Sequence, residues 1–362
     1  MTSRGRVRRA GVAAAVAVAP FAFAWRFAHV YRTRAGYPRQ HPPTFDPGSL
    51  GLPFQALEVQ AGDGLRLPAW WIPARGVAPG PAVVLVHGWE SGRHRTLPNA
   101  MVLNAIGYHV LTVDVRGHGA NPPEALPVSA GEFGSDALAG VRAALDRPDV
   151  TAVAVLGHSM GAAGAIIAAA AEPRVAAAVL VATPAGPYRL TRHTFRLARL
   201  PIPDPIAYPL AWLTTRVYLR PRGHRVDDVS ATSAVRRYRG PILAIHGTND
   251  RVMPIGHLRR LVAAARAARV DSPDAAPVEE ATIEGGEHSW LYEFASYRSA
   301  IGRFLAVALG GPLEPDEAAR VAAAVDARRP PDDEPRFAAL DDLEAAVGPA
   351  AAPGPGTAEA RP

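Results

Sequence analysis

Short runs of consecutive apolar residues recur along the chain and are separated by longer mixed segments. Five runs are long enough for strands, and they cover residues 82–86, 110–113, 152–156, 176–181 and 242–245. Runs that are apolar at every position are typical of parallel strands buried on both faces of a sheet. Stretches with a helical pattern fall between them, among them residues 132–145, 160–171 and 258–269. This alternation predicts a three-layer α/β fold.

A different pattern precedes the first of these runs. Apolar and polar residues alternate over residues 56–60 and 65–72, on either side of a Gly-Asp-Gly turn. Alternation with a period of two indicates half-buried strands, and the turn joins them as an antiparallel hairpin. We therefore expect two antiparallel strands before the parallel ones.

The alternation of strands and helices is interrupted between residues 181 and 242. About 55 residues there show no strand pattern, and they contain 11 arginines, several prolines and six aromatic residues. A structureless loop of this length would be anomalous in a compact domain, so we predict a helical cap over residues 184–238. Its aromatic residues are expected to pack as core rather than to clamp a substrate. Its arginines are expected to form a solvated face, with contact to anionic headgroups as the alternative.

The first 36 residues combine a basic start with an apolar stretch. Four arginines precede an uncharged run at residues 10–25, which as a helix would extend over about 24 Å. If the charge of Arg26 reaches the interface, the helix continues to residue 31 and spans the roughly 30 Å core of a bilayer. We predict a membrane anchor through residues 10–31. Two alternatives stay open: an amphipathic helix on the domain surface, and a secretion signal that ends near Pro20 and is cleaved beside Ala24, which would export the protein.

The remaining segments differ in composition from the main domain, which we assign to residues 54–310. Residues 37–53 form a proline-rich linker, and residues 311–362 form an acidic tail rich in proline and alanine. Within this tail, short helices are predicted at residues 314–329 and 335–347, whereas residues 348–362 have the composition of a disordered segment.

The composition excludes several classes of function. The chain has no cysteine, which rules out a disulfide framework, a thiolate nucleophile and a cysteine-based metal site. All its 39 cations are arginines, and the net charge is +6. These arginines are scattered, without a basic stripe or a nucleic-acid motif, so we expect no nucleic-acid partner.

One polar pentapeptide, from Gly157 to Gly161, separates a strand pattern from an alanine-rich helix pattern. Ser159 therefore lies at the apex of a sharp strand–turn–helix, where its backbone is strained and its neighbours must be small. Gly157 and Gly161 meet that need. A G-x-S-x-G motif in this context is typical of a nucleophilic serine.

A serine hydroxyl needs a base, and that base needs a carboxylate to hold it. Two later segments fit this requirement: Asp250 follows the buried strand at residues 242–245, and His288 lies in a glycine-rich loop after another predicted strand. The competing histidines are less suitable, because His246 lies within its strand and His257 begins a helix.

Two backbone N–H groups are candidates for stabilising a developing oxyanion. Trp89 follows His87 and Gly88 at the end of a strand, and Met160 follows Ser159 directly. Donors in these two places can point at the same carbonyl oxygen. We expect His87 and His158, which sit inside the motifs, to brace the site rather than to react.

These motifs agree in type, order and position, and through them the chain resembles the α/β-hydrolase superfamily over residues 54–310. It is similar to N-terminally anchored bacterial members of the serine aminopeptidase and monoacylglycerol lipase-like branch. The resemblance implies an eight-stranded, mostly parallel sheet, a cap between the sixth and seventh strands, and Ser159, Asp250 and His288 as a catalytic triad. It implies no metal and no organic cofactor.

The expected function is the hydrolysis of carboxylic esters, with a small-molecule or lipid-like ester as the partner. Two alternatives stay open: a peptidase or amidase that uses the same triad, and a catalytically silent binding protein of the same fold. Dehalogenase and epoxide hydrolase relatives are disfavoured, because they use an aspartate where Ser159 stands. No pattern indicates the oligomeric state.

Overall fold

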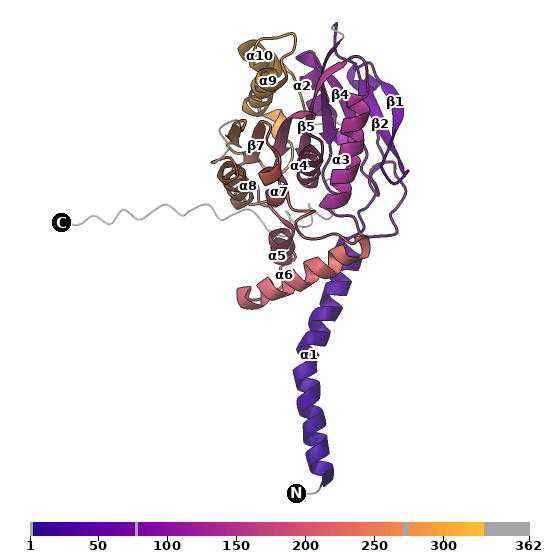
Figure 1. Ribbon diagram of the computed structural model, residues 1–362, viewed down its shortest axis with the longest axis vertical. Coiled ribbons are helices and arrows are strands. Elements are labelled where there is room, and N and C mark those ends of the chain that lie inside the picture. Colours follow the sequence, from indigo (N-terminus) through magenta and orange to yellow (C-terminus); the bar gives the residue numbers. More distant parts are fainter. Residues whose placement is uncertain (1–2, 77–78, 271–274, 329–362) are drawn as a thin grey trace, which may run out of the picture.

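A single twisted sheet organises the molecule (Figure 1). The computed structural model describes residues 3–76, 79–270 and 275–328, with side chains from residue 18 onward. The strands are β1 (Gln55–Gln60), β2 (Arg66–Ile72), β3 (Gly80–Val86), β4 (His109–Val113), β5 (Val150–His158), β6 (Val175–Val181), β7 (Ile242–Gly247) and β8 (Val278–Ile283). They are arranged in the order β1-β2-β4-β3-β5-β6-β7-β8.

The pairing of the strands confirms the predicted sheet. β1 pairs with β2 and β2 with β4 in antiparallel fashion, and the pairs from β4 to β8 are parallel. The two antiparallel strands are the predicted hairpin. The parallel strands β3, β4 and β7 are buried at every position, as their continuous apolar runs require.

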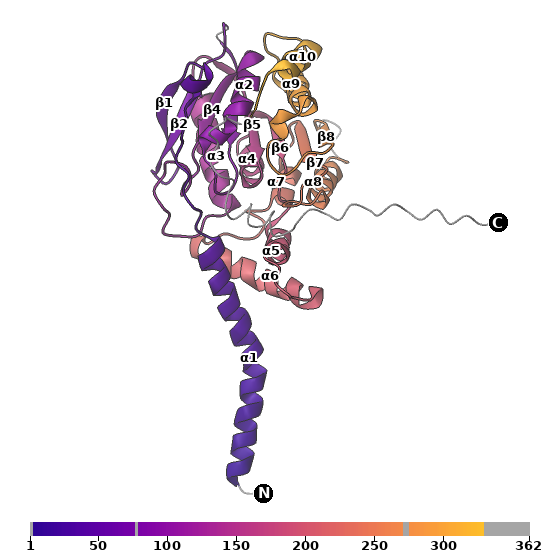
Figure 2. The same ribbon diagram turned by 180° about the vertical axis from the view of Figure 1, so that it is seen from behind.

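Helices cover both faces of the sheet and complete three layers (Figure 2). They are α2 (Leu97–Ala105), α3 (Ala130–Leu145), α4 (Met160–Ala171), α7 (Ala231–Arg237), α8 (Gly256–Ala267), α9 (Ala295–Leu309) and α10 (Pro315–Ala324). Residues of α3, α4, α7 and α8 join one buried cluster, and residues of α2, α9 and α10 join the other. Because successive side chains of a strand point to opposite faces, Val84 lies in the first cluster and Val83 in the second.

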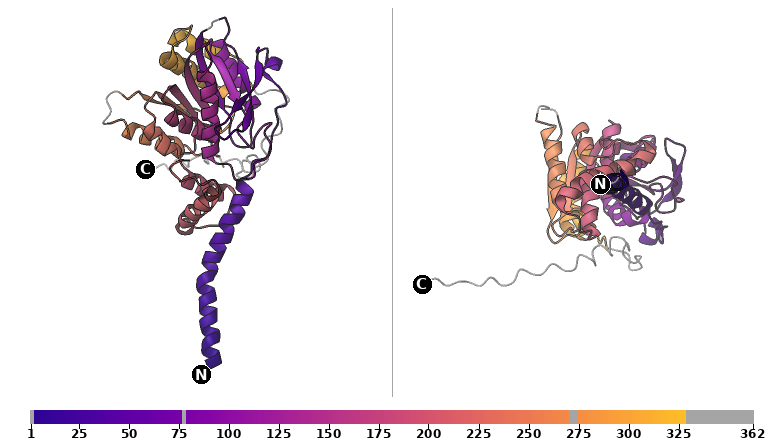
Figure 3. Two further views of the ribbon diagram at one scale, coloured as in Figure 1. Left: turned by 45° about the vertical axis from the view of Figure 1, so that its right-hand side comes forward. Right: turned by 90° about the horizontal axis from the view of Figure 1, so that it is seen from below.

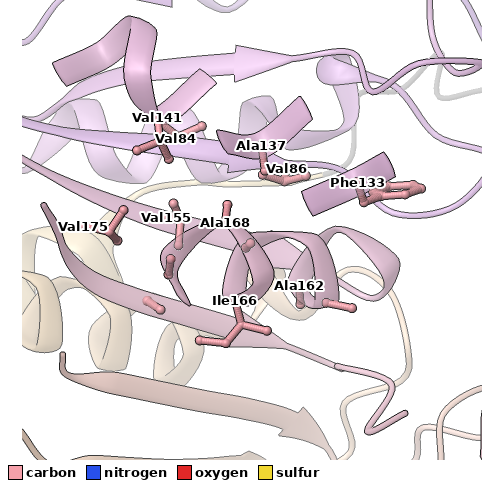
Figure 4. Packing of buried hydrophobic residues seen from close by; sticks show 14 of the residues in the cluster. Val84, Val86, Phe133, Ala137, Val141, Val155, Ala162, Ile166, Ala168 and Val175 are labelled. Carbon is pink, nitrogen blue, oxygen red and sulfur yellow. The ribbon is translucent and has the colours of Figure 1, made fainter. Parts of the chain in front are cut away.

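The first cluster packs the helices closely against the centre of the sheet (Figure 4). Val84 of β3 lies beside Val141 of α3, and Val86 lies beside Ala137 and Phe133 of the same helix. On the neighbouring helix α4, small residues allow a close approach, since a Cβ on Gly164 would lie 2.6 Å from the Cβ of Phe133. This packing fixes the position of α4, and therefore of its N-terminus, relative to the sheet.

Two further helices, α5 (Pro187–Leu197) and α6 (Asp204–Leu219), follow β6 in the segment where a cap was expected. They lie beyond the end of the sheet rather than on either of its faces (Figure 1). Phe195 of α5 and Leu210 of α6 form a small separate core between them.

The N-terminal helix α1 (Ser3–Ala35) projects away from the rest of the molecule (Figure 3). Its C-terminal part packs on the cap, with Phe27 and Tyr31 against the α5–α6 core. Pro20 lies inside this helix rather than ending it. An internal proline removes one hydrogen bond and its ring crowds the carbonyl group four residues earlier, at a cost of about 3 kcal/mol. The surrounding alanines are the strongest helix formers and favour continuation of the helix past that point.

The predicted membrane anchor, residues 10–31, falls on α1, but the side chains of residues 10–17 lie outside the described part of the chain. Among the residues that the structure describes, no helix has both the length and the apolar character needed to cross a bilayer. A transmembrane role for α1 is therefore not confirmed.

The packed core continues beyond residue 310. Helix α10 corresponds to the first helix predicted in the acidic tail, and its Ala318 and Ala322 are buried against α9. The predicted helix at residues 335–347 and the final segment 348–362 lie outside the described residues.

Candidate active site

Ser159 lies at the sharp turn between β5 and α4. Its backbone has φ 53° and ψ −120°, a region that costs a non-glycine residue of order 1–3 kcal/mol. The surroundings hold it there, because its N–H donates to the carbonyl oxygen of Val181 at 2.8 Å.

The two glycines of the pentapeptide are required by close backbone contacts. A Cβ on Gly157 would lie 2.3 Å from the carbonyl oxygen of Gly161, and a Cβ on Gly161 would lie 2.2 Å from that of His87. Both contacts are with backbone atoms, which cannot turn away as a flexible side chain can. The small residues thus bring β3, β5 and α4 together around Ser159.

The structure brings Ser159, His288 and Asp250 together from three separate loops. The Oγ of Ser159 lies 3.1 Å from Nε2 of His288, and Nδ1 of His288 lies 2.8 Å from Oδ2 of Asp250. All three residues are buried. Since the ionised carboxylate can only accept, Nδ1 of His288 carries the proton and Nε2 is free to accept one from the serine.

Asp250 is held as a carboxylate by its surroundings. Burial on its own would raise the pKa of Asp250, but the nearby imidazoles of His288 and His246 keep that pKa well below its ordinary value. The backbone N–H of Met253 also donates to Oδ1 of Asp250 at 2.6 Å. The carboxylate is therefore charged and has a fixed orientation.

His246 contacts this carboxylate as well, which the sequence analysis missed. Its Nε2 lies 3.2 Å from Oδ2 of Asp250 and 2.6 Å from the carbonyl oxygen of Met253. The strand pattern places His246 within a strand and so does not single it out as a site residue. The sequence feature that could have indicated this contact is the position of His246 near the end of its strand, four residues before Asp250. From there its side chain can reach the loop that follows.

The two histidines expected to brace the site contact backbone groups around it. His158 Nε2 lies 2.7 Å from the carbonyl oxygen of His288. Nε2 of His87 accepts a hydrogen bond from the backbone N–H of Val115. Nδ1 of His87 lies 2.7 Å from the carbonyl oxygen of Gly88. Burial lowers the pKa of His158 to about 4, so this ring is neutral at pH 7.

Trp89 and Met160, the expected oxyanion donors, both line the cavity beside Ser159. Met160 is the first residue of α4, where backbone N–H groups have no acceptor within the helix and the helix dipole favours negative charge. A Cβ on Gly88 would lie 3.5 Å from the Cβ of Ser159, so the segment just before Trp89 also runs close to the serine.

A cavity of about 520 Å³ opens above the three side chains. Its walls are mostly apolar and come from several elements, with Leu156 and Val181 from the sheet, Leu190 from α5 and Leu219 from α6. The end of α1 contributes Tyr31, Arg34 and Ala35. This contribution is not predicted from the sequence, because no local pattern shows that the end of the N-terminal helix packs on the cap.

Comparison with known proteins gives both relatives and structural neighbours. An uncharacterized protein of Mycobacterium tuberculosis is 30% identical over 209 residues, which are 57% of this chain and 66% of that relative. The match thus spans slightly less than two thirds of the relative's length.

Two solved structures show the same fold. The Pyrococcus furiosus esterase Pf2001 has a TM-score of 0.59 at 21% identity, covering 76% of this chain and 98% of that one. A puromycin-hydrolyzing peptidase of Mycobacterium tuberculosis has a TM-score of 0.55 at 20% identity, covering 72% of this chain and 40% of that one.

The family model of the alpha/beta hydrolases matches residues 83–300, which is more than half of the chain. This region contains the second half of β3, all of β4 to β8, and the three residues that meet beneath the cavity. The chain therefore belongs to the alpha/beta hydrolase family.

Proposed function

We propose that this protein is a hydrolase that cleaves carboxylic esters through Ser159, His288 and Asp250. The Oγ of Ser159 attacks the ester carbonyl while Nε2 of His288 takes its proton. The C–O bond to the leaving group then breaks, His288 gives that proton to the leaving alkoxide, and an acyl-serine remains. Water, deprotonated by His288, releases the acid and restores the serine.

The single observation that carries this proposal is the chain of short contacts from serine to histidine to carboxylate beneath one cavity. The distances of 3.1 and 2.8 Å suit proton transfer without rearrangement. Asp250 would hold the tautomer of His288 and stabilise its charged form. The N–H groups of Trp89 and Met160 would stabilise the oxyanion, each contributing about 3–4 kcal/mol.

The cavity favours an ester with an apolar acyl chain. Its volume of about 520 Å³ lies in the usual range for a ligand site, and its walls are mainly aliphatic and aromatic. Such a surface binds hydrocarbon by removing it from water.

The second candidate is amide or peptide hydrolysis by the same three residues. The observation that favours it is the buried carboxylate of Glu90, which lines the cavity one residue beyond Trp89. A carboxylate in this place suits the ammonium group of a peptide or an aminoacyl substrate.

A hydrolysis screen tests both candidates. We expect p-nitrophenyl esters of medium and long acyl chains to be cleaved, aminoacyl anilides to be cleaved much more slowly, and Ser159→Ala to abolish cleavage. Faster cleavage of the anilides would assign the enzyme to the amidases. Ester cleavage that persists in Ser159→Ala would refute the proposed role of Ser159, and a folded wild-type chain that cleaves neither class would indicate a silent binding protein.

The localisation of the protein stays a prediction from the sequence: it is either anchored in a membrane or exported after cleavage of a signal.

A further inference from the structure

A segment of α1 is apolar and exposed on every side. Residues 18–23 contain only alanine, valine, proline and phenylalanine, and all six are exposed, with Phe21 at 77% and Phe23 at 68%. A helix that is apolar all round is normally buried, either in a protein core or in a membrane. In this structure the segment projects away from the domain (Figure 3), so nothing in the described part of the chain covers it.

The outer face of α6 has the same character. Tyr208 and Trp212 are 59% and 50% exposed, one helical turn apart, and Ile206 and Pro209 lie exposed beside them. The exposed face of a surface helix is ordinarily polar. We call residues 18–25 of α1 together with Ile206, Tyr208 and Trp212 the α1–α6 apolar surface.

Helices α1 and α6 are held in a fixed arrangement by the small core that contains Phe195 of α5 and Leu210 of α6. Phe27 and Tyr31 of α1 pack on Phe195 of α5, with ring centroids 5.3 and 5.7 Å apart. Figures 1 and 3 show α6 lying across α1 at the end of the domain from which α1 projects. If α1 enters a bilayer along its normal, α6 therefore lies along the bilayer surface.

The charge around this surface indicates what covers it. Residues 18–35 and 187–219 contain eight arginines against one acid, Asp204. The guanidinium of Arg192 lies 4.1 Å from the ring of Tyr208, and that of Arg216 lies 3.7 Å from the ring of Trp212. Aromatic rings with arginines beside them are typical of the bilayer interface, and the excess of positive charge favours anionic headgroups.

The same helices form a wall of the cavity above Ser159. Tyr31 of α1 lines the cavity and contacts Thr194 of α5, with 2.8 Å between the two hydroxyl oxygens. Tyr218 of α6 lines it as well, and donates to the carbonyl oxygen of Ala35 at 3.1 Å. The cap thus separates the cavity from the α1–α6 apolar surface by the thickness of its helices.

We propose that the α1–α6 apolar surface docks on an anionic lipid bilayer, with residues 18–25 of α1 in the hydrocarbon and α6 at the headgroups. A hydrophobic ester then reaches the cavity from the bilayer rather than from water. The docking is independent of the proposed function. The delivery of an ester to the cavity rests on the proposed function.

The test compares two substrates for the full chain. The double variant Tyr208→Ser, Trp212→Ser is assayed on a long-chain ester embedded in phosphatidylcholine–phosphatidylglycerol vesicles and on a short, soluble p-nitrophenyl ester. The matched control is Val307→Ser, which removes a 65% exposed apolar side chain from α9 at the opposite end of the molecule. We expect vesicle activity to fall at least about tenfold, because two large rings leave the interface, while soluble activity and the control are unchanged. Equal vesicle activity in variant and wild type would overturn the proposal.

A charge comparison identifies the lipid. Replacing Arg192 and Arg216 by glutamate is expected to abolish the gain in vesicle activity that phosphatidylglycerol gives over phosphatidylcholine alone, whereas Arg320→Glu on α10 leaves that gain intact. A dimer in solution that Tyr208→Ser, Trp212→Ser dissociates, with vesicle activity unchanged, would assign the surface to a second copy of the chain and overturn the proposal.

Quenching by brominated lipid reports on docking without any catalysis. We expect quenching of tryptophan emission in the inactive Ser159→Ala chain, and less quenching when Trp212 is also replaced by phenylalanine. If Trp212→Phe leaves the quenching unchanged, α6 does not reach the lipid. If quenching is seen but no ester is hydrolysed by the wild type, docking holds and the proposed function fails.

Discussion

At the scale of single residues, the site depends on backbone positions that tolerate no side chain. The strained turn at Ser159 persists because β3, β5 and α4 meet around it, and they meet because Gly157 and Gly161 carry no Cβ. The two glycines of the motif are thus required because the backbone segments around the serine lie too close together to leave room for a Cβ.

We expect Gly161→Ala to lower the free energy of unfolding by more than about 3 kcal/mol, because the new methyl group would overlap backbone atoms that cannot move aside. The measurement is denaturant unfolding followed by circular dichroism. Gly256→Ala is the matched control, since a Cβ at this first residue of α8 meets nothing within 4 Å. Equal stability of the two variants would contradict the account of the turn.

The charge on Asp250 predicts how stability depends on pH. Its pKa is ordinarily 3.8 and is lower in the folded protein, so folding favours the ionised form. The resulting stability is fully present above the ordinary pKa and is lost as the pH falls through the lower folded value. We expect Asp250→Asn to flatten the dependence of the unfolding free energy on pH below about 4, whereas Asp316→Asn on the exposed surface of α10 keeps it. An identical acid dependence in wild type and Asp250→Asn would show that the pKa of Asp250 is not lowered.

At the scale of elements, the end of α1 belongs to the cavity as much as the cap does. Tyr31 fills the space between the cavity and Phe195, and its hydroxyl contacts Thr194. An N-terminal helix for which the sequence predicts an anchor, with a signal or a surface helix as alternatives, therefore helps to set the shape of the substrate site.

We expect Tyr31→Ala to shift the preference among p-nitrophenyl esters towards longer acyl chains, because the cavity extends into the space that the ring leaves. It should also lower the free energy of unfolding by about 3 kcal/mol through the lost packing. Tyr31→Phe keeps the ring and should keep the chain-length preference. The control Tyr37→Ala removes an exposed tyrosine. A profile of Tyr31→Ala that matches wild type would place the acyl chain elsewhere in the cavity.

At the scale of the whole molecule, the sequence was informative where local pattern and burial coincide. Continuous apolar runs predicted the strands β3 to β7, and the hairpin followed from alternation around a turn. The order of motifs along the chain was enough to single out Ser159, Asp250 and His288 as residues that should meet. The strand and hairpin predictions use information contained in a few neighbouring residues, and the prediction of the three site residues adds the order of their motifs along the chain.

The features that were missed depend on contacts between distant segments. Nothing near residue 31 indicates that it packs on residue 195, and nothing near Ala318 indicates that it completes the core against α9. The contact between His246 and Asp250 needed the path of the loop after β7, which the strand pattern does not give. Packing of this kind follows from the assembled fold.

The most direct test of the central claim is covalent labelling by a fluorophosphonate, which reacts only with an activated serine, followed by peptide mapping by mass spectrometry. The account predicts a single adduct on Ser159 in the folded wild-type chain, with labelling lost in Ser159→Ala and strongly slowed in His288→Ala. A folded wild-type chain that stays unlabelled, or an adduct on another serine, would contradict it.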